Sequence, residues 1–155
     1  AGPHPVRRGG HYLVLGGHGG LGLAVAERLA SAGAGSVALV SRSGGRDVDP
    51  AAVAAITAHG CAVDHRAADV NTPGGLREVV AAIRAERGAL HGVLHAAGTL
   101  RDGLLRTATR EDLAAVLAPK VDGVRELAAA VEGLELDFAV LFGSVSGAFG
   151  NLGQG

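Results

Sequence analysis

Short apolar runs alternate with longer segments of mixed polarity along most of this chain. The runs predict buried strands at residues 12–15, 37–40, 61–66, 92–95 and 138–142. Between them, apolar side chains recur every three or four positions, as on one face of a helix. Together with helix start and stop signals, this spacing predicts helices at about residues 20–32, 51–59, 73–87, 110–117 and 121–131. Thr72 is the expected cap of the helix that starts at Pro73.

This order of elements predicts a Rossmann-like, doubly wound parallel sheet in a three-layer α/β/α arrangement, truncated after the fifth strand. Strands that are apolar throughout are expected where helices cover both faces of the sheet. Right-handed crossovers place the carboxyl ends of all the strands at one edge. Polar and glycine clusters follow the strands and should therefore meet at this edge, where ligands bind in this fold class.

A glycine-rich loop lies between the first strand and the first helix. Gly16, Gly20 and Gly22 have the spacing G-x-x-x-G-x-G, although glycine is common in this chain, with 26 residues, and an ordinary turn is the alternative. Free backbone N–H groups and the helix dipole at such a turn favour a pyrophosphate, which a side chain would hold away. We expect His18 to bond locally and hold the turn. The predicted loop contacts are Gly16, Gly17, His18, Gly19, Gly20, Leu21 and Gly22.

The residues after the second strand indicate which nucleotide this loop binds. An NAD site usually has an acidic residue there, bonded to the ribose hydroxyls. Here Ser41 and Arg42 follow the strand, and a guanidinium makes a bidentate contact with a 2′-phosphate. The pattern favours NADP(H), and a solvated surface arginine is the alternative. Asp69 and Val70, after the third strand, are expected to flank the adenine.

Composition and charge exclude several other classes of protein. The chain has 155 residues, 48% of them hydrophobic, which suits one domain. A net charge of −1 with scattered basic residues argues against nucleic-acid binding. No apolar run approaches the roughly 20 residues of a membrane span. The single cysteine, Cys61, fits a reducing compartment, so we expect the cytoplasm. Residues 1–10 are expected to be a linker.

The histidines do not predict a metal site. His91 and His95 bracket a predicted strand, where residues four apart are separated by about 13 Å, too far to share one ion. With one cysteine and no dense carboxylate cluster, we expect no bound metal.

Six motifs, in this order and spacing, resemble the ketoreductase domains of modular polyketide synthases, which belong to the short-chain dehydrogenase/reductase superfamily. The resemblance extends from Gly10 to Gly155. It implies NADPH-dependent reduction of a β-ketoacyl thioester, carried by an acyl carrier protein, to a β-hydroxyacyl thioester. It also implies neighbouring polyketide synthase domains as partners. The motifs are Leu15-Gly-Gly-His-Gly-Gly-Leu-Gly22, Val40-Ser-Arg42, Asp69-Val70, His95-Ala-Ala-Gly98, Leu117-Ala-Pro-Lys120 and Phe142-Gly-Ser144.

The resemblance implies roles for residues at the matching positions. Ser144 corresponds to the serine that hydrogen-bonds the substrate ketone, and Lys120 to the lysine that orients the cofactor ribose and assists proton relay. Asp102 matches the last position of a Leu-Asp-Asp motif that marks B-type ketoreductases, although Arg101 replaces its middle residue and a solvated carboxylate is the alternative. Further cofactor contacts are implied at Ala96, Ala97, Gly98, Phe142 and Gly143.

The family's catalytic tyrosine follows the serine by about thirteen residues, a position just beyond Gly155. Tyr12 is predicted on the first strand and cannot replace it. We therefore expect the isolated chain to be an inactive half domain with an uncovered sheet edge, which a C-terminal ketoreductase segment would complement. Two alternatives are a catalytically inactive nucleotide-binding or structural module and a short-chain reductase of free small molecules. The position of Lys120 before Ser144 argues against the second.

Overall fold

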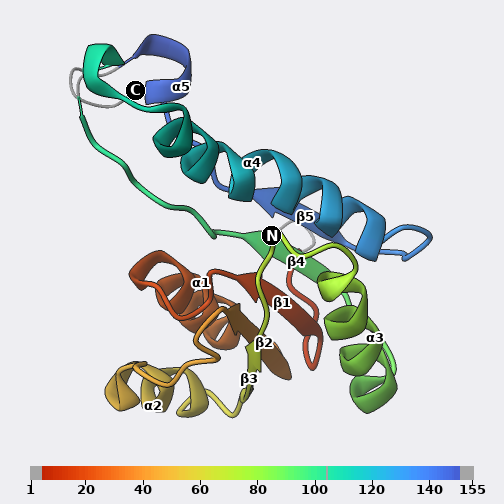
Figure 1. Cartoon of the computed structure of the whole chain (residues 1–155). Coiled ribbons are helices and arrows are strands. Elements are labelled where there is room, and N and C mark those ends of the chain that lie inside the picture. Colours follow the sequence, from red (N-terminus) through yellow and green to blue (C-terminus); the bar gives the residue numbers. More distant parts are fainter. Residues whose placement is uncertain (1–4, 104, 151–155) are drawn as a thin grey trace.

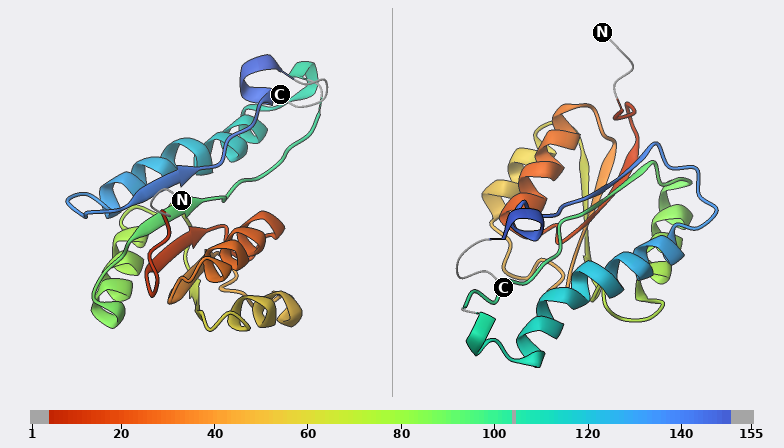
Figure 2. Two further views of the ribbon diagram at one scale, coloured as in Figure 1. Left: turned by 180° about the vertical axis from the view of Figure 1, so that it is seen from behind. Right: turned by 90° about the horizontal axis from the view of Figure 1, so that it is seen from above.

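The computed structural model describes residues 5–103 and 105–150, and within them the chain forms a five-stranded parallel sheet in the order β3-β2-β1-β4-β5. Figure 1 shows the long helix α4 lying along β5, and Figure 2 shows helices on both faces of the sheet. The strands are β1 His11–Leu15, β2 Ser36–Ser41, β3 Ala62–Ala67, β4 Gly92–His95 and β5 Phe138–Leu141. The helices are α1 Gly20–Ser31, α2 Pro50–Thr57, α3 Gly75–Arg87, α4 Arg110–Ala130 and α5 Ser146–Phe149, with a 3₁₀ turn at Leu105–Thr107. The Rossmann-like arrangement predicted from the sequence is confirmed.

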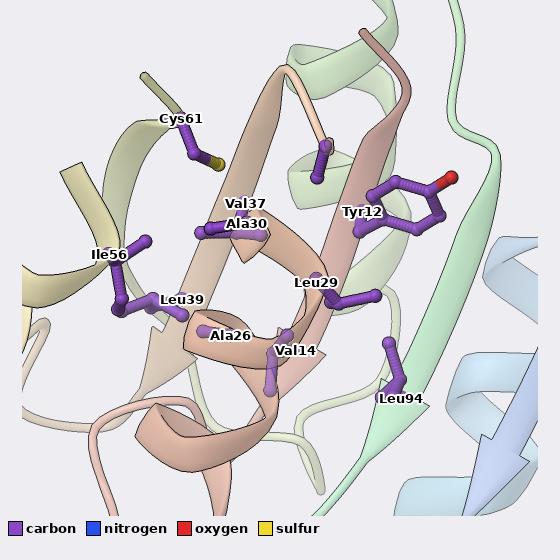
Figure 3. Packing of buried hydrophobic residues seen from close by; sticks show 11 residues of the cluster. Tyr12, Val14, Ala26, Leu29, Ala30, Val37, Leu39, Ile56, Cys61 and Leu94 are labelled. Atoms are coloured by element: carbon purple, nitrogen blue, oxygen red, sulfur yellow. The ribbon is translucent and has the colours of Figure 1, made fainter. Parts of the chain in front are cut away.

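Alternate residues of the central strands pack into two separate hydrophobic layers. On one face, Val14 and Leu39 pack with Leu29 of α1 and Ile56 of α2 (Figure 3). On the other face, side chains of the same strands pack with α3 and with the C-terminal part of α4; this layer includes Leu13, Leu15, Val40, Val93, Leu76, Val80, Ile83 and Leu127. Both faces of β1 and β2 are thus buried, which explains why these strands are apolar throughout.

The two helices expected at 110–117 and 121–131 are one continuous helix, α4, which contains Pro119, so the predicted break between residues 117 and 121 was wrong. An interior proline costs about 3 kcal/mol because it has no N–H and crowds the carbonyl four residues earlier. Pro119, Gly123 and Leu127 are buried along one side of α4, and this burial offsets the cost. A Cβ at Gly123 would lie 3.1 Å from Val70 Cγ2, so the glycine lets the helix approach the sheet closely.

The start of α3 also differs from the prediction. Its cap is Gly74, at φ 77°, rather than Thr72, and the helix begins at Gly75. The Gly74 N–H donates to Oε2 of Glu126 on α4 at 2.7 Å. This contact between two helices distant in the sequence fixes where α3 begins, and the local sequence contains no signal for it.

β5 departs from the expectation that every strand is buried on both faces. It pairs with β4 alone among the described residues, and Leu141 retains 54% of its accessible surface. Val140, Val145 and Phe149 are exposed as well. Within the described residues β5 therefore forms an open sheet edge, as predicted, with exposed apolar side chains on β5 and on residues 145–149.

Residues at the end of the expected linker pack against the domain. The Arg7 guanidinium pairs with both carboxylate oxygens of Asp137 at 2.6 Å. The backbone N–H of Arg7 donates to the Tyr12 hydroxyl at 2.7 Å. The Gly9 N–H donates to the Gly33 carbonyl at 2.8 Å. None of the helices described is long and apolar enough to cross a membrane.

Candidate nucleotide-binding and catalytic site

A cleft of about 470 Å³ opens at the carboxyl edge of the sheet. Its walls come from the loop after β1, the ends of β2, β3 and β4, and the first half of α4. The lining residues are Gly16, Gly19, Val40, Ser41, Arg42, Ala68, Asp69, Val70, Asn71, Ala96, Ala97, Gly98, Thr99, Arg101, Ala115, Ala118 and Pro119. The clusters that follow β1, β2, β3 and β4 therefore meet at one edge, as predicted, whereas no residue after β5 is among the lining residues.

The glycine loop is held by close backbone contacts. Gly16 has φ +74°, and a Cβ there would lie 2.6 Å from the Ala97 nitrogen. A Cβ at Gly17 would lie 2.8 Å from Leu39 Cα, and one at Gly22 would lie 2.3 Å from the Gly16 oxygen. By contrast, Gly19 lines the cleft with its nearest such contact at 3.4 Å. These glycines thus have two different roles. Gly16, Gly17 and Gly22 permit tight packing of the backbone, whereas Gly19 keeps the cleft wall free of a side chain.

His18 bonds to residues of β2 and β3 rather than locally, so that expectation was wrong. Its Nδ1 lies 2.6 Å from Ser41 Oγ at the end of β2, and its Nε2 lies 2.9 Å from Nδ1 of His65 on β3. Burial, followed by the nearby His65, lowers the pKa of His18. Arg42 is exposed beside Ser41, and both line the cleft. The hydrogen bond between His18 and β3 depends on His65, a residue that the sequence did not predict to belong to the site.

Asp69 and Val70 lie at the cleft, as predicted. One carboxylate oxygen of Asp69 accepts the N–H of Asn71 at 2.9 Å and shapes the turn after β3. The side-chain oxygen of Asn71 is buried, with no hydrogen-bond partner among the described residues. Asn71 and Thr99 line the cleft and were missed, because each simply follows a recognised motif.

Lys120, in the middle of α4, lies close to the segments that follow β4 and β5. Its Nζ donates to the Phe142 carbonyl at 3.0 Å, and a Cβ at Gly98 would lie 3.5 Å from the same nitrogen. Ser144 is exposed two residues beyond Phe142, and its Oγ accepts the Ser146 N–H at 3.1 Å. The structure therefore brings Lys120 to the segment 142–144, although Ser144 is not among the cleft-lining residues.

Asp102 and Tyr12 lie outside the cleft. Asp102 is exposed in the segment after β4, while its neighbour Arg101 lines the cleft. Tyr12 is buried on β1, stacked against Phe138 at 5.6 Å, and burial raises the pKa of its hydroxyl. It packs at the start of the strands, opposite the cleft, and its position excludes it as a proton donor there.

His91 and His95 lie at opposite ends of β4. Nδ1 of His91 accepts the His11 N–H at 3.0 Å. His95 is buried behind the cleft wall, and burial lowers the pKa of its ring. No group of three or more histidine, cysteine, aspartate or glutamate side chains that could hold a metal ion occurs in residues 5–103 and 105–150.

Comparison with known proteins identifies the family. Residues 10–155 match the model of the KR domain. The phthioceranic/hydroxyphthioceranic acid synthase of Mycobacterium tuberculosis H37Rv is 40% identical over 96% of this chain. Polyketide synthase PksN of Bacillus subtilis strain 168 is 35% identical over 97%. The chain covers 7% and 3% of these two proteins, respectively.

Solved structures agree with this assignment. A ketoreductase from the macrolactin assembly line has a TM-score of 0.85 at 33% identity, covering 96% of this chain and 30% of that one. An A-type ketoreductase of a modular polyketide synthase has a TM-score of 0.81 at 37% identity, with 97% and 32% coverage. This chain therefore belongs to the KR family, the ketoreductase domains of polyketide synthases.

Proposed function

We propose that this chain binds NADPH and acts in the reduction of a β-ketoacyl thioester, held on an acyl carrier protein, to a β-hydroxyacyl thioester. The observation that carries the proposal is the single cleft formed by the glycine loop, by Ser41 and Arg42, and by the end of β4. In the glycine loop, a side chain at Gly16 or Gly17 would lie too close to neighbouring backbone atoms. The KR matches support the reaction class and neighbouring polyketide synthase domains as partners.

The residues present fit a phosphorylated nicotinamide nucleotide. The loop and the start of α1 provide N–H groups and a positive dipole for a pyrophosphate. Arg42 follows β2 where an NAD site usually has a carboxylate, and an exposed guanidinium at that position can bind a 2′-phosphate in bidentate fashion. Bound at this site, NADPH supplies the hydride.

Ser144 and Lys120 are the proposed catalytic residues. Negative charge grows on the ketone oxygen as the carbonyl carbon is reduced, and fixed donors such as the Ser144 hydroxyl stabilise it there. The Lys120 ammonium, held on the Phe142 carbonyl, contributes positive charge beside the same segment. The same positive charge lowers the pKa of an acidic group placed beside it, such as the proton donor, and so assists proton transfer.

The proton that completes the alcohol is expected from outside residues 1–155. These residues include one tyrosine, Tyr12, which is buried opposite the cleft. We propose that a polypeptide of these residues alone binds nucleotide without reducing substrate, and that a C-terminal ketoreductase segment complements it. The exposed apolar side chains of β5 and α5 offer such a segment a surface to cover.

The test compares Arg42→Ala with Arg28→Ala, which removes an exposed arginine from α1. Binding of NADPH and NADH is measured by calorimetry on the purified protein that carries this chain. Arg42→Ala should weaken NADPH binding at least tenfold, since hydrogen bonds to charged groups contribute about 1.5–3 kcal/mol. Binding of NADH should change less than about twofold, and Arg28→Ala should leave both unchanged.

Turnover is measured by mass spectrometry on a protein that carries this chain together with a C-terminal ketoreductase segment, with a β-ketoacyl thioester on a carrier protein as substrate. The proposal requires a β-hydroxyacyl product that is lost in Ser144→Ala. Binding of NADPH without any product would instead favour a nucleotide-binding module that has lost catalysis. Equal affinities of the wild type and Arg42→Ala for NADPH would refute the assigned 2′-phosphate contact.

A further inference from the structure

The rings of His18 and His65 lie side by side next to Ser41, which lines the cleft. The rings of His18 and His65 are 5.2 Å apart between centroids and inclined by 16°. His18 bridges Ser41 Oγ at 2.6 Å and His65 Nδ1 at 2.9 Å, and Ser41 Oγ lies 3.2 Å from Ser43 Oγ. His18, Ser41 and His65 come from the β1 loop, the end of β2 and β3, so this chain of hydrogen bonds links three neighbouring segments of the sheet.

The loop after β2 fits closely over both rings. Gly45 has φ +82°, and a Cβ there would lie 2.6 Å from His18 Nε2 and 2.8 Å from His65 Nδ1. Any side chain at this position would displace one of the rings. The pair is therefore held between the glycine loop and the loop that carries Ser41 and Arg42.

The hydrogen-bond geometry links the direction of the Ser41 hydroxyl to the protons of the pair. If His18 donates from Nε2 to His65, its Nδ1 is an acceptor and takes the Ser41 O–H. If His18 donates from Nδ1 to Ser41 Oγ, the Ser41 O–H is free to point elsewhere. This second arrangement needs His65 to donate to Nε2, or an additional proton on His18 so that both of its nitrogens donate.

We propose that the His18–His65 pair sets specificity for the 2′-phosphate by directing the Ser41 hydroxyl into the cleft and by taking up a proton when the phosphate binds. Ser41 lines the cleft beside Arg42, so its hydroxyl is the group through which the pair acts on the nucleotide. This inference rests on the proposed binding of NADPH at these two residues. His18 and His65 are positioning residues in this scheme.

The charges around the pair permit such a switch. Burial and the proximity of His65 lower the pKa of His18, which favours the neutral form of this ring in the free protein. Arg66, next to His65, is paired with Glu86 of α3. The first charged residue of α1 is Glu27, about two turns after the helix begins at Gly20, at about 3.6 residues per turn. The remaining charged groups on the surrounding segments are Arg42, Arg46, Asp47, Asp49, Asp64 and Asp69.

The sign of the pH dependence follows from linkage. A dianionic phosphate favours the charged imidazole, so binding takes up a proton and affinity rises as the pH falls below neutral. The phosphate itself gains a proton near pH 6, which acts in the opposite direction. Only a comparison with a variant that lacks the pair separates these two effects.

The test uses His65→Leu, which removes the partner of His18 at an exposed position, and His59→Leu as a matched control at the exposed end of α2. Dissociation constants for NADPH and NADH are measured between pH 6.0 and 7.5 on the purified protein. As the pH falls over this range, the affinity for NADPH should rise about fivefold more in the wild type and in His59→Leu than in His65→Leu. Binding of NADH should differ less than about twofold among all three. Nitrogen NMR of the imidazoles should show protonation of the pair when NADPH is added.

Each outcome decides the inference. Identical pH profiles and NADPH-to-NADH ratios in the wild type and His65→Leu would overturn it, even if NADPH binds tightly and the proposed function stands. Failure of the wild type to bind NADPH at any pH would overturn both proposals. If His65→Leu lost as much affinity for NADH as for NADPH, His65 would have a structural role. The proposed effect on specificity for the 2′-phosphate would then be refuted.

Discussion

Replacement of Gly22 by alanine should destabilise the fold and weaken nucleotide binding together. A Cβ at this position would lie 2.3 Å from the Gly16 oxygen and 2.7 Å from Gly17 Cα. Both atoms belong to the backbone of the cleft loop, which is also hydrogen-bonded to the Val40 carbonyl. The added methyl group therefore cannot be accommodated by rotation of a side chain, and the loop itself must move.

The magnitude follows from two opposing contributions. Overpacking typically costs about 1–3 kcal/mol, and backbone contacts place this case at the upper end. Alanine is better than glycine in a helix by about 1 kcal/mol, which offsets part of the cost. A net loss of about 2 kcal/mol corresponds to a fall in Tm of about 4–8 °C for a domain of this size.

Gly19→Ala is the matched control for Gly22→Ala. Its backbone has φ −82°, which alanine adopts readily, and its Cβ would make an ordinary 3.4 Å contact with the Gly16 oxygen. The Tm should therefore change by less than about 2 °C. Because Gly19 lines the cleft, however, NADPH binding should still weaken.

Thermal unfolding and calorimetric titration with NADPH measure both effects on the same samples. The reasoning predicts that Gly22→Ala loses stability and affinity, whereas Gly19→Ala loses affinity alone. If Gly22→Ala melted like the wild type and bound NADPH equally well, the close packing inferred for the loop would be refuted.

Two further predictions concern pH. Arg7 lowers the pKa of Asp137 by hydrogen bonding and charge, so the stability from this pair is present at neutral pH and lost as the pH falls through the lowered folded pKa. Asp137→Asn should therefore melt below the wild type at pH 7, and the difference in Tm should narrow as the pH falls below the ordinary carboxyl pKa of 3.8; a constant difference would contradict this. Burial lowers the pKa of His95, so the unfolded state binds more protons below about pH 6.5 and the wild type should lose stability there. His95→Asn should flatten this dependence in urea unfolding at pH 7.5 and 5.5, and parallel profiles would argue against it.

The local sequence determined the order of strands and helices and the place of the nucleotide loop. Continuous apolar runs such as Val37–Val40 identify strands buried on both faces, and the spacing of Gly16 and Gly22 marks the turn that follows β1. These signals involve neighbours in the chain, so they are visible without the fold. The carboxyl-edge position of Ser41, Arg42 and Asp69 followed from topology rules alone.

The tertiary structure decided what depends on residues far apart in the sequence. His18 and His65 are separated by 47 positions, and their hydrogen bond exists only because the ends of β1 and β3 lie on either side of β2. Lys120 reaches the Phe142 carbonyl across 22 positions. The continuity of α4 through Pro119 and the exposure of β5 likewise reflect which surfaces each element packs against. Local patterns report the periodicity of one segment, whereas burial and side-chain pairing depend on the segments that the fold places beside it.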